Sequence, residues 1–246
     1  MQESEPIRVA IIRGGTSKGV YLHADVLPKD PVIRDKIILS IFGSPDPRQI
    51  DGLGGADPLT SKVAIIAPSS RPDADVDYTF GYVGIDKAAV DYHGNCGNIS
   101  QGVGSFAIDE GLVHVTEPIT RVRIFNTNTQ KIIEAEVPVR NGRALTEGDV
   151  VLHGVPGSGA GIVMNFVNSA GSKTGKLLPT GNVIDKIELT GGRSVRCSLV
   201  DAANPAVFVQ AAEIGLNGTE LPADTATDPR ILAIMEAPQL SSKGQL

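Results

Sequence analysis

Strand-like patterns of apolar residues dominate the first third of the chain. Apolar runs at residues 7–12 and 20–22 flank a glycine-rich segment, which predicts two strands joined by a turn. Residues 62–67 form another apolar run, as expected of a buried strand. Residues 77–83 place aromatic side chains at alternate positions, which is typical of a half-buried strand.

Two segments show helical spacing instead. Residues 31–42 carry apolar side chains on one side, with Pro31 in the first turn and Gly43 directly after the last. Residues 99–111 show the same spacing and end on Gly111, a residue type that commonly terminates helices. We expect a helix at each segment.

β-patterns return in the second half of the chain. Residues 121–125 and 131–139 alternate on either side of an Asn-Thr-Asn-Thr link, which predicts a hairpin. Further strands are expected at 162–167, 184–189, 196–200 and 206–210, and the last two of them are expected to flank a turn at 201–205. Residues 168–182 are rich in Ser, Gly, Lys and Pro and have the character of a linker. We therefore place a domain boundary near Gly181.

Composition narrows the class of protein. Apolar residues make up 41% of the 246 residues but aromatics only 4%, so the core must be built from aliphatic side chains. A net charge of −6 without Lys/Arg clusters argues against nucleic-acid binding. Neither a membrane-spanning apolar run nor a signal peptide is expected. Two distant cysteines in dissimilar contexts favour a reduced, cytoplasmic setting.

Residues 93–98, with the sequence His-Gly-Asn-Cys-Gly-Asn, immediately precede the second predicted helix. Cys96 is therefore expected at a helix N-terminus, where free N–H groups and the helix dipole favour the thiolate and can hold a carboxylate. Glycine beside the sulfur leaves room for a ligand. A buried structural cysteine in a glycine-rich turn is the alternative, and these residues alone leave both open.

Lys62 opens an otherwise apolar strand, directly after the glycine-rich segment 52–55. A lysine at the junction of loop and strand can reach into a cleft and act as a base or a proton donor. The alternative is a side chain that extends from the strand end into water. Taken alone, this position favours the alternative.

Residues 13–19 place Thr16 and Ser17 between glycines, where hydroxyl and backbone N–H groups could hold an oxyanion. The spacing differs from that of a nucleotide-binding P-loop, and the glycines of 154–161 lack the strand-to-helix context of a dinucleotide site. Ordinary turn glycines would explain both segments. The four histidines are scattered, so no metal site is expected.

Five short motifs follow one another in a fixed order along the chain. They are Arg13-Gly14-Gly15-Thr16-Ser17-Lys18-Gly19, Asp51-Gly52-Leu53-Gly54-Gly55, Thr60-Ser61-Lys62, Gly94-Asn95-Cys96-Gly97-Asn98 and Asp201-Ala202-Ala203-Asn204-Pro205. In this combination, and from about residue 7 to residue 220, the chain resembles the PrpF family, whose relatives include 3-methylitaconate isomerase and 4-oxalomesaconate tautomerase.

This resemblance implies an α+β, diaminopimelate epimerase-like fold, in which two pseudo-symmetric lobes of mixed β-sheet wrapped around a central helix face one another across a cleft. We expect residues 1–182 to form the N-terminal lobe with the catalytic residues, and residues 183–246 to begin the second lobe. Members of the family are considerably longer, so the second lobe is expected to be incomplete. Cys197, on a predicted strand without neighbouring glycines, is not expected to be a second catalytic thiol.

The resemblance also implies a cofactor-independent isomerase that shifts a C=C bond by allylic 1,3-proton transfer. The substrate would be a small unsaturated di- or tricarboxylate such as methylitaconate, aconitate or oxalomesaconate. Lys62 and Cys96 are expected to be the acid/base pair. The expected substrate contacts are Thr16, Ser17, Asn95, Gly97, Asn98 and Asn204.

Two other functions stay open at this point. A PrpF-type chain could be an accessory protein that supports an iron–sulfur 2-methylcitrate dehydratase, in which case contact with that partner is its task. A Cys-dependent hydrolase would form an acyl adduct on Cys96. The expected ligand is a small polycarboxylate, with neither nucleic acid nor membrane as partner, and a homo-oligomer is compatible with the sequence.

Overall fold

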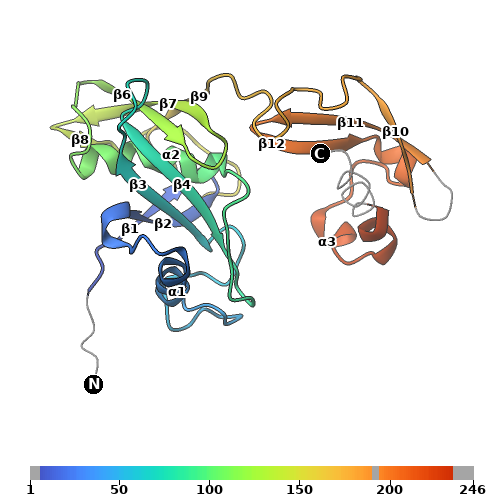
Figure 1. The fold of residues 1–246 in the computed structure, drawn as a ribbon, viewed down its shortest axis with the longest axis horizontal. Coiled ribbons are helices and arrows are strands. Elements are labelled where there is room, and N and C mark those ends of the chain that lie inside the picture. Colours follow the sequence, from blue (N-terminus) through green and yellow to red (C-terminus); the bar gives the residue numbers. More distant parts are fainter. Residues whose placement is uncertain (1–5, 190–193, 235–246) are drawn as a thin grey trace. The chain divides into compact units, whose positions relative to one another are not determined.

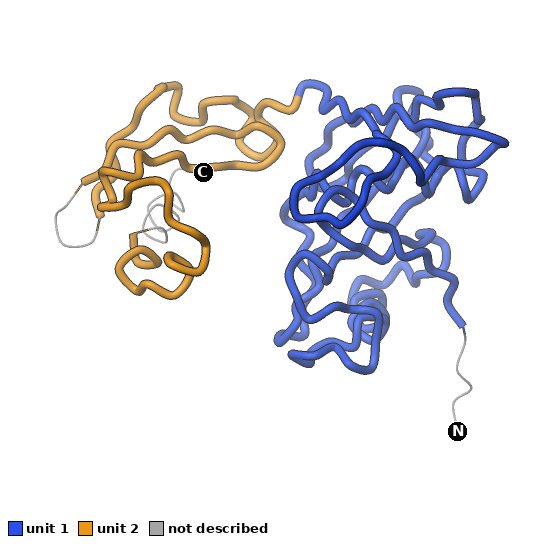
Figure 2. Tube along the Cα trace, turned by 180° about the vertical axis from the view of Figure 1, so that it is seen from behind, with its two compact units in different colours: residues 1–168 blue, residues 169–246 orange. Residues whose placement is uncertain are grey.

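The computed structural model describes residues 6–189 and 194–234 (Figure 1). The chain forms two compact units, residues 1–168 and 169–246 (Figure 2). The expected boundary after residue 182 thus lies inside the second unit. The linker-like segment that precedes it is bonded to that unit, since Gly171 donates its N–H to the carbonyl of Asp201, and Asp201 donates to that of Leu177.

A nine-stranded mixed sheet builds the first unit. Its main path is β1 (Ala10–Gly14), β2 (Ser17–His23), β3 (Lys62–Pro68), β4 (Val76–Val83), β6 (Ile119–Asn126), β7 (Lys131–Arg140) and β8 (Arg143–Ala144). Two further strands, β5 (Val90–Asp91) and β9 (Val163–Phe166), pair with β4 and β7. The β2–β3 and β4–β6 pairs are parallel and the other pairs are antiparallel. Each strand predicted for this unit overlaps an observed one, whereas the two-residue strands β5 and β8 were too short to predict.

Helix α2 (Gly97–Asp109) runs through the core of this unit and contacts strands along most of the sheet (Figure 1). It begins two residues before the first predicted apolar position. Two of its glycines permit this close packing. A Cβ on Gly102 would collide with the Tyr21 hydroxyl, and one on Gly104 would lie 2.7 Å from Val137 Cγ2. The sheet and α2 therefore share one interior.

Helix α1 (Pro31–Phe42) matches its prediction and covers the other face of the sheet. The Asp30 side chain accepts the N–H groups of Val32 and Ile33, and Gly43 ends the helix in a left-handed conformation. Alternate residues of β2 and β3 face the two sides, so that Tyr21 packs with α2 and Leu22 packs with α1. A 3-10 turn, η1 (Ala24–Val26), follows β2.

An antiparallel sheet forms the second unit, in the order β10 (Asp185–Glu188), β11 (Ser194–Ala202) and β12 (Asn204–Val209). The turn expected at 201–205 is present but shorter than five residues. The two strands stay paired up to Ala202 and Asn204, and the chain reverses at Ala203, whose φ is 65°.

The rest of this unit is η2 (Ala211–Ile214), α3 (Pro222–Thr225) and a helical segment at 229–234. Its buried apolar core consists of Ile187, Leu189, Val195 and Cys197. None of the helices in the described ranges is long and apolar enough to cross a membrane.

Candidate active site

The first unit brings Lys62 and Cys96 into direct contact. Lys62 Nζ lies 3.4 Å from Cys96 Sγ and 3.0 Å from Ser17 Oγ. Cys96 is the N-cap of α2, as its sequence predicts, and its sulfur makes no capping hydrogen bond. Lys62 is the first residue of β3 and is half-buried, so the interpretation of a side chain extended into water is wrong. An amine and a thiol in contact form a pair that can exchange protons.

The turn between β1 and β2 docks on the start of α2. Asn98 Nδ2 donates to Thr16 Oγ1 at 3.0 Å and to Ser17 Oγ at 3.4 Å. Gly14 and Gly15 are required for this contact, because a Cβ on either would collide with Asn98. The glycines of the predicted oxyanion loop are therefore explained by packing against α2.

Thr16 and Ser17 differ in exposure although they are neighbours. Ser17 is 2% exposed, whereas Thr16 is open to solvent. Ser17 Oγ accepts hydrogen bonds from Lys62 and Asn98, which uses both of its lone pairs and leaves its own O–H to donate. The structure thus brings Thr16, Ser17, Lys62, Cys96 and Asn98 together, and their roles toward a substrate stay predictions.

The N-terminus of α2 presents unbonded donors beside the sulfur. Among the described residues, no acceptor takes the backbone N–H of Gly97 or Asn98. Gly97 is exposed, and a Cβ placed on it would meet only Phe166, at 3.6 Å. This end of the helix therefore has the N–H groups and the space that binding of a carboxylate needs.

The Asn95 side-chain oxygen is engaged within the protein. It accepts from Asn126 Nδ2 at 3.1 Å and from Ser100 Oγ at 3.3 Å. The Ser100 hydroxyl also lies 2.9 Å from the Cys96 carbonyl oxygen. Asn95 is therefore tied to the scaffold around Cys96, and its expected contact with substrate stays a prediction.

Two tyrosines lie beneath the helix start. The Tyr21 hydroxyl donates to the carbonyl of Ile99 at 2.6 Å. Burial, together with the nearby Cys96, raises the pKa of Tyr21 far above its ordinary range, and burial does the same for Tyr78. Both phenols therefore stay neutral and leave Lys62 and Cys96 as the groups that can exchange a proton here.

Buried amides that the sequence did not single out support the site. Gln49, 1% exposed, donates from Nε2 to the hydroxyls of Ser44 and Ser61 and accepts the N–H of Ala56. It thereby ties the glycine-rich loop to the residue that precedes Lys62. A glutamine in a polar loop carries no sequence signal that it is buried.

Gln101 supports the other side of the site. It lies on α2, and its side-chain oxygen accepts the N–H of Gly15 at 3.0 Å. The sequence feature that could have identified Gln101 is a long polar side chain in a largely apolar helix, on the turn that follows Cys96.

One expected substrate contact, Asn204, lies in the second unit, as does the second cysteine. Asn204 begins β12, and its assignment to the substrate stays a prediction from the resemblance. Cys197 is 3% exposed in β11, and burial raises the pKa of its thiol. A neutral buried thiol is a poor candidate for a second catalytic thiol.

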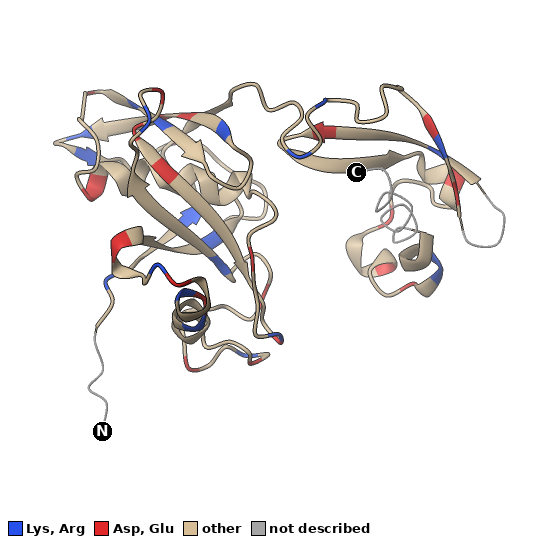
Figure 3. Ribbon diagram, viewed as in Figure 1, with Lys and Arg blue, Asp and Glu red and all other residues tan. Residues whose placement is uncertain are grey.

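Three further features concern possible metal ligands, surface charge and a cavity. No cluster of three or more metal-ligating side chains occurs in the described part of the chain. Figure 3 shows basic and acidic residues interspersed in each unit. A hollow of about 460 Å³ lies at the C-terminal end of α1, where Lys36 and Asp51 line it, and it includes neither Lys62 nor Cys96.

Comparison with protein families gives a match over most of the chain. The model described as PrpF protein matches residues 5–244. The chain is 55% identical over 236 residues to a 3-methylitaconate isomerase of Eubacterium barkeri, covering 96% of this chain and 62% of that protein. It is 49% identical over 228 residues to a 4-oxalomesaconate tautomerase of Pseudomonas putida, covering 91% and 62%. The chain thus spans about three fifths of the length of these relatives.

Solved structures give the same fold. A crystal structure of methylitaconate-delta-isomerase matches with a TM-score of 0.77 at 54% identity and covers 96% of this chain and 62% of that one. A probable proline racemase from Agrobacterium radiobacter matches with a TM-score of 0.52 at 15% identity, over 93% of this chain and 60% of that one. The predicted α+β, epimerase-like fold is confirmed.

Proposed function

Because the chain belongs to the PrpF family, we propose that the protein is an isomerase that shifts a C=C bond in a small unsaturated polycarboxylate. Methylitaconate, aconitate and oxalomesaconate are the substrate types we favour, since relatives of this chain are named as isomerases or tautomerases of 3-methylitaconate, 2-methyl-aconitate and 4-oxalomesaconate. We propose Lys62 and Cys96 as the catalytic pair, acting without a cofactor.

The 3.4 Å contact between Lys62 Nζ and Cys96 Sγ carries this proposal. Reacting atoms approach to roughly 3–3.5 Å, so two groups on opposite faces of one carbon must stand about twice that distance apart. These two groups are too close to enclose a single carbon, as a racemase pair would. They can instead serve the two ends of an allylic unit from one face.

The proposed reaction transfers one proton from the substrate to the enzyme and one proton from the enzyme to the substrate. One group removes a proton from the first carbon, and the C–H electron pair enters a dienolate that extends to a carboxylate. The other group delivers its proton to the carbon two bonds away, and the double bond shifts. Because Lys62 and Cys96 touch, the proton gained by one can return to the other before the next turnover.

Charge on the dienolate needs donors that are already in place. We assign one carboxylate to the backbone N–H groups of Gly97 and Asn98 at the start of α2. We assign another to the hydroxyls of Thr16 and Ser17. Ser17 suits this role because both of its lone pairs are occupied, so its hydrogen is left for the substrate.

The test is solvent-deuterium incorporation into a panel of unsaturated polycarboxylates, read by NMR with purified full-length protein. Cys96→Ser and Lys62→Ala should each lower the exchange rate by at least about 100-fold, since each removes an acid/base group. Cys197→Ala is the matched control and should exchange at the rate of the unmodified protein. Unchanged exchange in the Cys96 and Lys62 variants would remove the proposed roles.

The same assay separates the other functions. If the purified protein turns over none of these acids, the result would favour the accessory function, in which the protein supports an iron–sulfur dehydratase. An acyl adduct on Cys96, detected by mass spectrometry, would instead indicate a hydrolase.

A further inference from the structure

Two asparagine side chains at the turn between β6 and β7 form hydrogen bonds to the segment that precedes Cys96. Asn126, the last residue of β6, and Asn128, in the link that follows, direct their carboxamides to the segment 92–96, which carries Cys96. We call Asn126 and Asn128 the asparagine clamp. They come from the far end of a hairpin, thirty or more positions along the chain from the segment that they hold.

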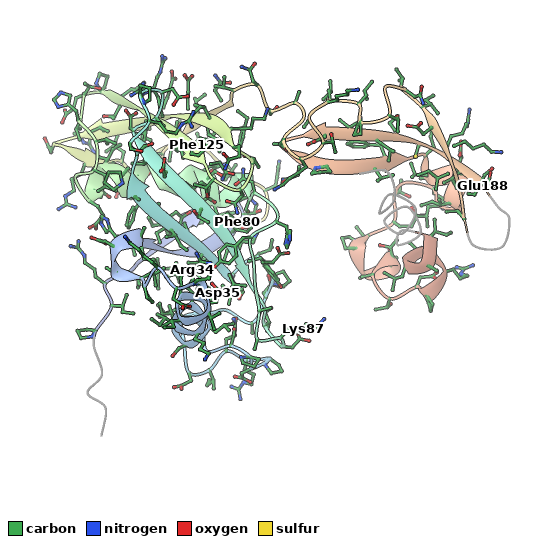
Figure 4. All side chains as sticks on the ribbon, viewed as in Figure 1. Arg34, Asp35, Phe80, Lys87, Phe125 and Glu188 are labelled. Carbon is green, nitrogen blue, oxygen red and sulfur yellow. The ribbon has the colours of Figure 1, made fainter. Side chains whose placement is uncertain are left out.

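Asn128 replaces a missing strand neighbour. Strand β6 ends at Asn126, but β4 continues to Phe80 and beyond (Figure 4). The Phe80 N–H donates to Asn128 Oδ1 at 2.8 Å, and Asn128 Nδ2 donates back to the Phe80 carbonyl at 2.9 Å. The same Nδ2 donates to the Tyr92 carbonyl at 2.7 Å, so one carboxamide joins the sheet to the first residue of the segment.

Asn126 acts at the other end of the segment. Its side chain is fully buried, and its Oδ1 accepts from the backbone N–H and the hydroxyl of Thr129, both at 2.8 Å. With its orientation set in this way, Nδ2 points to Asn95 Oδ1 at 3.1 Å. Asn95 directly precedes Cys96, so the contact lies next to the thiol.

Tyr92 is also held from α1. Its hydroxyl donates to Asp35 at 2.6 Å, and the Arg34 guanidinium lies 4.7 Å from the centre of its ring. Figure 4 labels Arg34 and Asp35 on this helix. The segment that leads to Cys96 is thus fixed at Tyr92 and at Asn95, with only His93 and Gly94 between them.

We propose that Asn126 and Asn128 are positioning residues that hold Cys96 Sγ against Lys62 Nζ. A displacement of about 1 Å at a reacting group can cost about 100-fold in rate, and a group held by buried hydrogen bonds avoids this loss. The kinetic part of the proposal rests on the proposed isomerase function, whereas the reactivity of the Cys96 thiol tests the clamp by itself.

The experiment compares Asn128→Asp and Asn126→Asp in the full-length protein. Each variant keeps the accepting oxygen and replaces the donor by an oxygen that faces a carbonyl. Asn141→Asp makes the same change in charge at the exposed β7–β8 turn and is the matched control. We measure alkylation of Cys96 by iodoacetamide with peptide mass spectrometry, kcat and KM for isomerisation, and thermal unfolding.

We expect Asn128→Asp to lower kcat by about 10- to 100-fold while KM changes by less than about threefold, because orientation and not binding is lost. The alkylation rate of Cys96 should change by at least about threefold, since the thiol leaves its place beside Lys62 at the helix N-terminus. Asn126→Asp should act in the same direction, and Asn141→Asp should change neither quantity.

A folded clamp variant with unaltered kcat and unaltered Cys96 alkylation would overturn the proposal. Failure of both clamp variants to fold would also count against it, because the two residues would then serve the fold as a whole. If the unmodified protein isomerises no acid, the proposed function fails, but a changed alkylation rate in the clamp variants would still support positioning.

Discussion

At the scale of single residues, the chemistry of the proposed site depends on how hydroxyls and amides are used. Ser17 joins Lys62 from β3 to Asn98 from α2 and is itself almost fully buried. The ammonium of Lys62 therefore has two contacts, the sulfur of Cys96 and the oxygen of Ser17. Removing the oxygen leaves a half-buried charge with one partner fewer.

Ser17→Ala should lower kcat/KM for isomerisation by about tenfold or more, because a hydrogen bond to a charged group contributes about 1.5–3 kcal/mol. The measurement is steady-state kinetics together with the temperature of unfolding, which separates a local effect from loss of the fold. Ser158→Ala, at an exposed turn, is the control and should resemble the unmodified protein. Activity of Ser17→Ala equal to that of the control would contradict the assigned contact.

At the scale of elements, helix α2 sets the geometry, since it carries Cys96 and fills the interior of the first unit. Glycine inside a helix is unfavourable by about 1 kcal/mol relative to alanine. α2 nevertheless has Gly102 and Gly104, which face Tyr21 and Val137 at close range. Packing thus outweighs helix propensity at these two positions.

Gly104→Ala should lower the free energy of unfolding by about 1–3 kcal/mol, because the added methyl group overpacks the core against Val137. Urea denaturation measures the change. Ser105→Ala, on the same helix and half-buried, should be neutral or slightly stabilising. If the Gly104→Ala variant were more stable than the unmodified protein, helix propensity would contribute more than packing to the free energy of unfolding at this position.

At the scale of the whole chain, the two units differ in how their parts are held. The first unit has two apolar cores on opposite faces of its sheet, whereas the second has one small core. The second unit relies in addition on Asp201, whose side chain is fully buried. Asp201 accepts the N–H groups of Lys173 and Thr174 at 2.8 and 2.7 Å and the Ser172 hydroxyl at 2.8 Å.

These contacts predict a loss of stability in acid. Burial by itself would raise the pKa of Asp201, but the N–H groups of Thr174 and Lys173 and the neighbouring hydroxyls lower it below its ordinary value. A lowered folded-state pKa contributes stability above the unfolded-state value of about 3.9, and this contribution is lost as the pH falls through the folded-state pKa. The second unit should therefore become less stable below about pH 4.

Hydrogen exchange followed by mass spectrometry can measure this effect in the intact protein, with peptides of the first unit as internal reference. Asp201→Asn should speed exchange in the second unit at pH 7, and its difference from the unmodified protein should shrink as the pH falls toward 3. A difference that stays constant with pH would show that the Asp201 charge does not stabilise this unit.

Local sequence determined where most helices and strands lie. The period of two at 77–83 reflects which side of that strand is buried. In the helix at 31–42 only Ile38 and Phe42 are buried, and Val32 and Ile33 are exposed. The ends of this helix were therefore indicated by Pro31 and Gly43 rather than by an apolar side. The turn at 201–205 is shorter than the sequence indicated, because Pro205 is tolerated in a strand at the edge of a sheet. The linker-like composition of 168–182 also gives no indication that this segment is hydrogen-bonded to β11.

Sequence also identified Cys96 at a helix N-terminus, since glycine and asparagine before an apolar helical pattern are local signals. Only the tertiary structure placed Lys62, thirty-four residues away, at 3.4 Å from the sulfur, and only it turned Asn126 and Asn128 toward the segment before Cys96. The physical reason is that periodicity reports burial within one element. Which side chains meet depends on how the sheet curves around α2, and no single segment carries that information.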